Sequence, residues 1–317
     1  MKTLIFSLVA AIAAASLHAA EPKELRIATQ PSPLYSPIFV AKQKGWVEEE
    51  FKKDGFTVKW SSFVAGPPEN ESFLAGQQDI GFIGDTPLIV GRSVGLNTRV
   101  IGIASTAPSA LALAVPKGSA IHAVADLKEK KVGVTKGSYA HHLLFLLLKN
   151  AGLKSTDIKL IHLPPGDLVT AFSRGDLDAA VTWEPYLGEL ENLGGKVIAD
   201  GSGGVKEGAV VIFAVDDFGK KNPEVLQRFL KIYQKGVEFI KANPEETAKL
   251  VAPEAKIPAE QVLKLLPKFD FSPLIKPGHI AELKKTETFL RENNLTSGPV
   301  DIDAFFDTSY QKAAGLQ

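Results

Sequence analysis

The sequence predicts an α/β fold made of two similar lobes that are joined by a two-strand hinge. From residue 24 onward, strand-like and helix-like segments alternate at the spacing of parallel βαβ units. One strand–turn–helix stretch also occurs twice along the chain, as an internal repeat. Ligands of such folds gather beyond the carboxyl ends of the strands, so we expect a binding cleft between the lobes.

The clearer copy of the repeated stretch runs from residue 73 to residue 87. It reads as the end of a helix, a buried strand over 80–83, and a turn that starts a new helix. Asp85 or Thr86 can cap that helix, and Pro87 suits its first turn. A helix start just past a strand leaves backbone N–H groups free, which favours an anion site there.

The second copy ends in a similar apolar strand, acidic residue and proline. Three residues of the first copy recur in it with the same spacing, namely Phe73, Gly76 and Asp79 as Phe172, Gly175 and Asp178. In this register Glu184 falls on Asp85. The repeat therefore predicts two related lobes that each present helix starts to a shared cleft.

Composition restricts the function. The chain has 317 residues, a formal net charge of zero and no cysteine. The neutral balance argues against nucleic acid as a partner. The absence of cysteine excludes disulfides, thiolate metal sites and a cysteine nucleophile. We expect no metal and no cofactor.

The first 20 residues have the pattern of a signal peptide. Lys2 supplies a positive start, residues 4–15 are apolar, and Ala19 and Ala20 offer small residues for cleavage. The apolar run is short for a membrane span. We therefore predict export to the periplasm.

The domain boundaries follow from the strands that carry the chain between lobes. Segments 110–115 and 209–215 are predicted to leave and re-enter the first lobe. Lobe 1 then comprises 21–109 and 210–317, and lobe 2 comprises 110–209. Within lobe 1 we expect a strand at 24–29, one helix over 38–51, and a strand at 56–64. The remaining amphipathic helices, predicted at 224–242, 244–251, 259–266 and 279–293, should pack around lobe 1.

Several short motifs carry a family resemblance. They lie at residues 65–68 (AGPP), 84–87 (GDTP), 124–128 (VADLK), 136–141 (KGSYAH) and 183–186 (WEPY). Together they resemble the periplasmic aliphatic-sulfonate-binding proteins, which are solute receptors of ABC importers close to the taurine and nitrate receptors. The resemblance implies a type II periplasmic-binding-protein fold that closes over its ligand, and a permease as partner. The loop at 30–35 is more proline-rich than is usual in the family. Because this loop touches the predicted pocket rim, the identity of the ligand stays open.

The candidate ligand residues come from the turns at the predicted cleft. Polar candidates are Thr86 and Ser138 as hydroxyl donors, with Ser138 equally suited to capping its helix, and Asp85, for which a cap is favoured. His141 matches a motif position of the family, whereas the adjacent His142 should be structural. The aromatic candidates are Tyr35, Tyr139 and Trp183, and the turn residues are Gly66, Pro67 and Gly137.

Glu184 is open to three readings, because a carboxylate repels an anion unless it caps a helix, meets a ligand ammonium or pairs with a cation. The predicted turns contain no arginine, and Lys136 is their only evident cation. Carboxylate receptors usually use a bidentate arginine, whereas a sulfonate can be held by N–H and hydroxyl groups.

These features favour a monomeric, non-enzymatic receptor for an organic sulfonate. A taurine, nitrate or thiamine-precursor receptor of the same fold is the alternative, and a sensory role without transport stays open. No Ser/His/Asp arrangement, metal cluster or phosphate loop points to catalysis.

Overall fold

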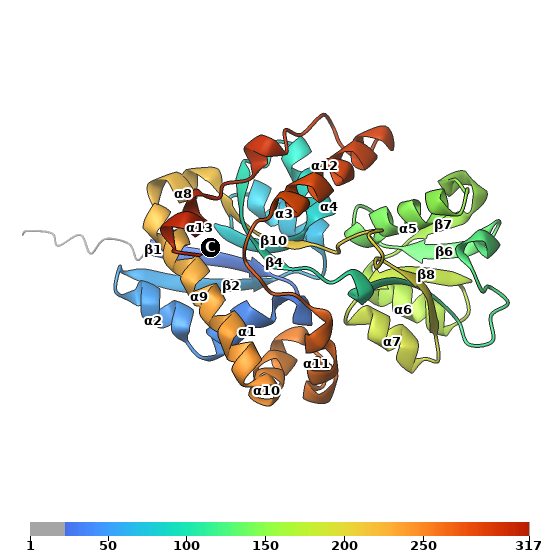
Figure 1. Cartoon of the computed structure of the whole chain (residues 1–317), viewed down its shortest axis with the longest axis horizontal. Coiled ribbons are helices and arrows are strands. Elements are labelled where there is room, and N and C mark those ends of the chain that lie inside the picture. Colours follow the sequence, from blue (N-terminus) through green and yellow to red (C-terminus); the bar gives the residue numbers. More distant parts are fainter. Residues whose placement is uncertain (1–22, 317) are drawn as a thin grey trace, which may run out of the picture.

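The computed structural model describes residues 23–316, which form two lobes, each built on a five-stranded sheet (Figure 1). The predicted signal peptide lies outside the described residues. The strands are β1 (Lys23–Thr29), β2 (Phe56–Ser62), β3 (Ile80–Gly84), β4 (Thr98–Ser105), β5 (Leu111–Val115), β6 (Lys131–Val134), β7 (Lys159–His162), β8 (Ala179–Trp183), β9 (Lys196–Asp200) and β10 (Val210–Val215). Their order is β2-β1-β3-β10-β4 in lobe 1 and β7-β6-β8-β5-β9 in lobe 2.

Helices cover both sheets. Lobe 2 carries α5 (Tyr139–Asn150), α6 (Pro165–Ser173) and α7 (Tyr186–Asn192). Lobe 1 carries α1 (Ser36–Gln43), α2 (Trp46–Lys52), α3 (Gly66–Leu74), α4 (Asp85–Ser93), α8 (Asp216–Lys221), α9 (Pro223–Ala242), α10 (Pro244–Ala255), α11 (Ala259–Leu265), α12 (Pro277–Glu292) and α13 (Ser309–Ala313). Two short 3-10 helices also matter for the site, η1 (Pro33–Tyr35) and η5 (Leu266–Lys268).

The internal repeat is visible as a matching topology of the two sheets. In each lobe three neighbouring strands run parallel, and one antiparallel strand, β10 or β5, lies between the third of them and the edge strand, β4 or β9. The repeated aspartates do the same work, since the Asp79 carboxylate accepts the Arg26 N–H at 2.9 Å and the Asp178 carboxylate accepts the Lys131 N–H at 2.7 Å. The predicted two-lobe α/β fold is confirmed.

The chain crosses between the sheets twice, after β4 and after β9. The two crossing segments are hydrogen-bonded to each other. The Ala107 N–H donates to the Glu207 carbonyl at 3.1 Å, and the Gly201 N–H donates to the Pro108 carbonyl at 3.0 Å. This paired crossing is the two-strand hinge of the fold.

Local differences from the predicted elements have identifiable causes. The single helix expected over 38–51 is wrong, because Gly45 adopts a left-handed conformation (φ +69°) and divides it into α1 and α2. The strand expected over 56–64 ends at Ser62, before the turn into α3. The C-terminal helices α9 and α10 pack against α1 on lobe 1, as predicted.

The largest cluster of buried apolar side chains continues from lobe 1 across the interface into lobe 2. It includes Tyr35 and Phe82 on one side and Tyr139 and Trp183 on the other. Contact between lobes is thus part of the core in this conformation. Between residues 23 and 316, no helix has the length and apolar character needed to cross a bilayer.

Candidate functional site

The two lobes touch each other at the carboxyl ends of their strands. The Ser32 hydroxyl in lobe 1 donates to the backbone carbonyl of Glu184 in lobe 2 at 2.9 Å. The Tyr139 ring of lobe 2 packs on Gly84, 3.5 Å from the position that a Cβ of residue 84 would take. The structure therefore has the cleft closed.

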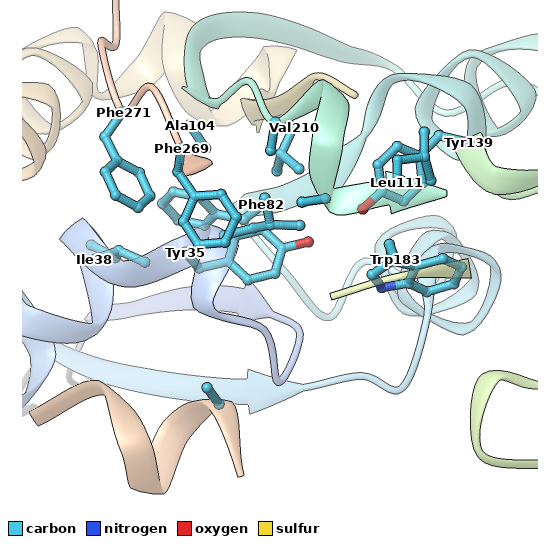
Figure 2. Close-up of a cluster of buried hydrophobic side chains, with 14 of the residues drawn as sticks. Tyr35, Ile38, Phe82, Ala104, Leu111, Tyr139, Trp183, Val210, Phe269 and Phe271 are labelled. Atoms are coloured by element: carbon cyan, nitrogen blue, oxygen red, sulfur yellow. The ribbon is translucent and has the colours of Figure 1, made fainter. Parts of the chain in front are cut away.

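Tyr35, Tyr139 and Trp183 lie in an aromatic cluster at this interface (Figure 2). Tyr35 packs edge-on against Phe82, with ring centroids 5.9 Å apart, and Tyr139 lies 5.4 Å from Trp183. Figure 2 shows the hydroxyl groups of Tyr35 and Tyr139 pointing toward one another from opposite lobes. Both residues are buried, at 2% and 6% exposed, and neither hydroxyl makes a hydrogen bond within residues 23–316.

Both phenols are held in the donor form. Burial raises the pKa of Tyr35 and of Tyr139 well above the usual value, so both keep their protons at physiological pH. The structure thus brings together the O–H donors of two buried tyrosines that the sequence placed in different lobes. Such a pair can donate to one anionic oxygen between them.

The helix start after Gly84 differs from the prediction. The Asp85 N–H donates to the Ala209 carbonyl at 3.1 Å, and the Thr86 N–H donates to Asp85 Oδ1 at 2.6 Å. The next residue, Pro87, has no N–H. The expected free N–H groups at this helix start are therefore absent, because Ala209 and the Asp85 side chain accept them. The Thr86 hydroxyl also donates to Asp85 Oδ1, at 3.0 Å.

The start of α5, unlike that of α4, keeps free backbone N–H groups. Ser138 is its N-cap, with Oγ accepting the His141 N–H at 3.2 Å and donating to the Thr135 carbonyl at 2.7 Å. The N–H groups of Tyr139 and Ala140, in the first turn, have no acceptor in the described part of the chain. Gly137 has φ +71°, which lets the turn reach this helix start.

Asp85 forms a buried ion pair that sequence reasoning missed. Lys206, from the second crossing segment, donates to Asp85 Oδ2 at 2.6 Å, and both side chains are completely buried. The Thr286 hydroxyl of α12 donates to the same oxygen at 3.0 Å. The expectation that Asp85 is a simple cap is wrong, because a cation from outside the predicted turns reaches it. Lys206 is distant in sequence and lies in a glycine-rich turn, so no local pattern marks it.

Glu184 combines two of its three predicted roles. Oε2 accepts the Gly188 N–H in the first turn of α7 at 3.0 Å, and Oε1 accepts the Lys268 ammonium at 3.2 Å. Lys268 belongs to η5 of lobe 1, so this ion pair joins the two lobes. Burial raises the pKa of Glu184, with the Lys268 charge acting in the opposite direction. A ligand ammonium is not needed to account for this carboxylate.

The two histidines of α5 are both buried. His141 accepts the Gly137 N–H at Nδ1 (3.3 Å), and burial lowers its pKa to about 4. The His142 ring stacks on Phe289 of α12, with ring centroids 4.1 Å apart, which is a further contact between the lobes. Burial also lowers the pKa of His142. Both imidazoles are therefore neutral at pH 7.

A cavity of about 380 Å³ opens between the lobes beside these turns. It is lined from lobe 1 by the turn before and into α3, including Val64 and Pro67, and from lobe 2 by the turns at 135–136 and 162–165. Gly66 is required for this turn, since a Cβ there would lie 2.5 Å from Pro87 Cβ. Apart from Lys136 and His162, the walls are mainly apolar.

Glu69 is a further interface residue that sequence reasoning did not select. It lies in the first turn of α3 and is fully buried, with Oε2 accepting the Gln30 amide at 2.8 Å. Burial raises the pKa of Glu69 to about 8. An acidic residue directly after the two prolines of a cleft turn was the available signal. Among residues 23–316 no group of three metal-ligating side chains occurs.

Comparison with known proteins shows which family the chain belongs to. Residues 32–247 match the family model described as NMT1/THI5 like. A Bacillus subtilis (strain 168) protein whose name assigns it to the aliphatic sulfonates-binding proteins is 31% identical over 92% of this chain and 88% of its own length. The taurine-binding periplasmic protein of Escherichia coli (strain K12) is 32% identical over 61% of each chain.

The solved structures that superimpose well on this one also include sulfonate-binding proteins. The periplasmic aliphatic sulphonate binding protein SsuA from Escherichia coli superimposes with a TM-score of 0.79 at 30% identity, over 90% of this chain and 92% of that one. The alkanesulfonate-binding protein SsuA from Xanthomonas axonopodis pv. citri, bound to MOPS, gives 0.81 at 26%, over 91% and 99%. The fold and the function class predicted from the sequence are those of these receptors. The chain belongs to the NMT1/THI5-like family and, within it, groups with the periplasmic aliphatic-sulfonate-binding proteins.

Proposed function

We propose that this protein is the extracytoplasmic receptor of an ABC importer, that it binds an organic sulfonate between its lobes, and that it delivers the ligand to the permease. The observation that carries the proposal is the pair of buried tyrosines, Tyr35 and Tyr139, whose hydroxyls point toward each other across the interlobe interface. Each lobe supplies only one of them, so a ligand held by both favours the closed state.

The remaining donors suit the same head group. The free N–H groups of Tyr139 and Ala140 start a helix of twelve residues, and a helix N-terminus favours an anion. Together with the hydroxyls they supply enough donors for a tetrahedral group with three acceptor oxygens. No arginine takes part, which favours a weakly basic anion over a carboxylate.

The apolar surroundings favour a ligand with a tail. Trp183 and the cavity beside Val64 and Pro67 offer contact to methylene groups. Nitrate has no group to cover these surfaces. Taurine or a thiamine precursor is the alternative ligand of a receptor with this fold.

We infer binding rather than catalysis, and a periplasmic, monomeric protein. The desulfurization enzyme DszB has this fold but is only 16% identical, so that likeness concerns the fold alone. The chain has no cysteine for nucleophilic chemistry. Its sulfonate-binding relative from Escherichia coli is periplasmic.

Calorimetry tests the ligand class. The competition series is propane-1-sulfonate, butanoate as the matching carboxylate, nitrate, and a thiamine-precursor pyrimidine. We expect the sulfonate to bind tightest, and small-angle scattering at saturation to show a smaller radius of gyration than without ligand. Tightest binding of butanoate or nitrate would contradict the proposal, and an unchanged radius would contradict closure about the hinge.

A further inference from the structure

Glu69 has one oxygen that the protein does not use. Its Oε2 accepts the Gln30 amide at 2.8 Å, and the Phe82 backbone N–H lies near the carboxyl group, but the buried Oε1 makes no hydrogen bond within residues 23–316. Buried carboxyl oxygens are nearly always hydrogen-bonded, because losing water without a replacement is costly. An unpaired oxygen of this kind can accept a donor that is not part of the chain.

The carboxyl group lies on the side of lobe 1 that meets lobe 2. Gln30 follows β1 directly, and Ser32, two residues later, donates to lobe 2. On the other side, Pro67 and Pro68 precede Glu69 and line the interlobe cavity. The charge of Glu69 also contributes to the raised pKa of Tyr35, so the carboxyl group is near that hydroxyl. A ligand that is hydrogen-bonded to the Tyr35 hydroxyl would therefore lie near Glu69.

The other buried carboxylates at this interface already have cations. Asp85 pairs with Lys206, and Glu184 pairs with Lys268. Among the residues that the structure describes, Glu69 has no such lysine or arginine partner. It is the one of the three that can accept a positive charge from outside.

We propose that Glu69 receives an ammonium group of the ligand, so that the receptor selects zwitterionic aminosulfonates over plain alkanesulfonates. The proposal rests on the proposed sulfonate-binding function. The sulfonate lies toward the start of α5 and the two tyrosine hydroxyls, and the ammonium lies toward Glu69 Oε1. Glu184, the residue that the sequence offered for this role, is already paired.

Proton release follows from this arrangement. Without ligand, burial raises the pKa of Glu69 to about 8, so the group is mostly neutral at pH 7. An ammonium beside it favours the carboxylate, so binding expels a proton into solvent. The groups around Glu69 are Gln30, the backbone at Phe82, Tyr35, and through Tyr35 the phenols of Tyr139 and Tyr233. The phenols stay protonated, so the proton comes from Glu69.

The test uses two probes of nearly equal size, 2-aminoethanesulfonate and propane-1-sulfonate, which differ by an ammonium against a methyl group. Calorimetry at pH 7 in two buffers of different ionisation enthalpy counts the protons. We expect release of about 0.9 proton with the aminosulfonate, from a group of pKa about 8, and none with propane-1-sulfonate. Affinity for the aminosulfonate should rise about tenfold per pH unit between pH 6 and 7.

Glu69→Gln keeps the size and the bond to Gln30 while removing the charge. It should weaken aminosulfonate binding about ten- to a hundredfold, the usual effect of losing a bond to a charged group. Binding of propane-1-sulfonate should change less than about threefold. Glu71→Gln, on the exposed side of the same helix, is the charge-matched control and should change neither affinity.

Three results would overturn the inference. Equal affinity for the two probes would refute the ammonium site alone and leave sulfonate binding intact. Aminosulfonate affinity that falls above pH 8, without proton release at pH 7, would mean that Glu69 acts as a neutral donor. Binding of neither probe would refute the proposed function together with this inference. The wild-type proton count decides the matter even if Glu69→Gln does not fold.

Discussion

The two copies of the strand–turn–helix stretch each bury a carboxylate and pair it with a lysine, but the two ion pairs have different connections. Asp85 pairs with Lys206 of the crossing segment, and both side chains are 0% exposed. Glu184 pairs with Lys268 of the opposite lobe, whose side chain is 37% exposed. The first pair ties the lobe 1 turn to the hinge, whereas the second fastens one lobe to the other.

The difference shows how one repeated position serves two purposes. In both turns the backbone N–H of the acidic residue donates to a carbonyl at the end of a crossing segment, Ala209 for Asp85 and Ala110 for Glu184. The repeat thus sets the backbone. The lysine that reaches each carboxylate comes from a part of the chain outside the repeat. We expect the lobe 1 pair to control stability and the pair between lobes to control closure.

The largest effect should follow from breaking the lobe 1 pair. Lys206→Met leaves Asp85 buried without its cation, which typically costs about 3–5 kcal/mol. Urea unfolding at pH 7 measures the loss. The double variant Asp85→Asn with Lys206→Met should recover most of it, since no charge is then left alone. A loss below about 1 kcal/mol in the single variant would contradict a structural role for this pair.

A second effect comes from lobe 2, where His141 lies at the start of α5. Its pKa is lowered to about 4 in the folded protein, against about 6.5 when unfolded. The unfolded chain therefore binds the proton more readily between these values, and stability falls as the pH drops from 6.5 to 4. The contribution reaches up to about 3 kcal/mol.

Unfolding curves across this pH range should be flatter for His141→Gln than for the wild type. His142 acts in the same direction, so the slope should not vanish. The exposed His122 supplies the control, because His122→Gln should leave the curve unchanged. Equal slopes for His141→Gln and the wild type would show that His141 is protonated freely in the folded state.

Glu184→Gln sharpens the comparison with Asp85. Burial raises the pKa of Glu184, so its folded-state stabilisation is greatest when protonated and is lost as the pH rises through the folded pKa. The ionised form is thus a cost at pH 7, and Gln still accepts the Gly188 N–H. We expect a change within about 1 kcal/mol, against a much larger loss for Asp85→Asn. Equal losses of stability in Glu184→Gln and Asp85→Asn would mean that the two ion pairs contribute equally to stability.

The smallest effect concerns closure. Lys268→Met removes a partly exposed ion pair between lobes, worth about 0.2–1 kcal/mol, so ligand affinity should fall about 1.5- to 5-fold. Lys264→Met is the control, because Lys264 pairs with Glu260 within one helix of lobe 1. Its affinity should match the wild type. A loss of affinity in both variants would show a general charge effect rather than one on closure.

Some features of the site were accessible from local sequence, and others were not. The turns at Gly66, Gly84 and Gly137 could be found because glycine and proline mark backbone geometry directly. The pairing of Tyr35 with Tyr139 could be predicted only as membership of one cleft. Which hydroxyl is used depends on the folded geometry: the Thr86 hydroxyl donates to the adjacent Asp85, whose carboxylate Lys206 holds in place, whereas the two phenols make no hydrogen bond within residues 23–316.

The sequence by itself determined the two-lobe α/β architecture, the repeat and the family, because strand and helix periodicity, turn residues and motifs are all local signals. Tertiary structure alone decided the charges of the site. Lys206 reaches Asp85 across 121 positions of the chain, and Lys268 reaches Glu184 across 84. Glu69 became a candidate only because its buried Oε1 makes no hydrogen bond within residues 23–316. The protonation state of a side chain depends on desolvation and on the neighbours that folding brings together. The adjacent residues in the sequence reveal neither of these two effects.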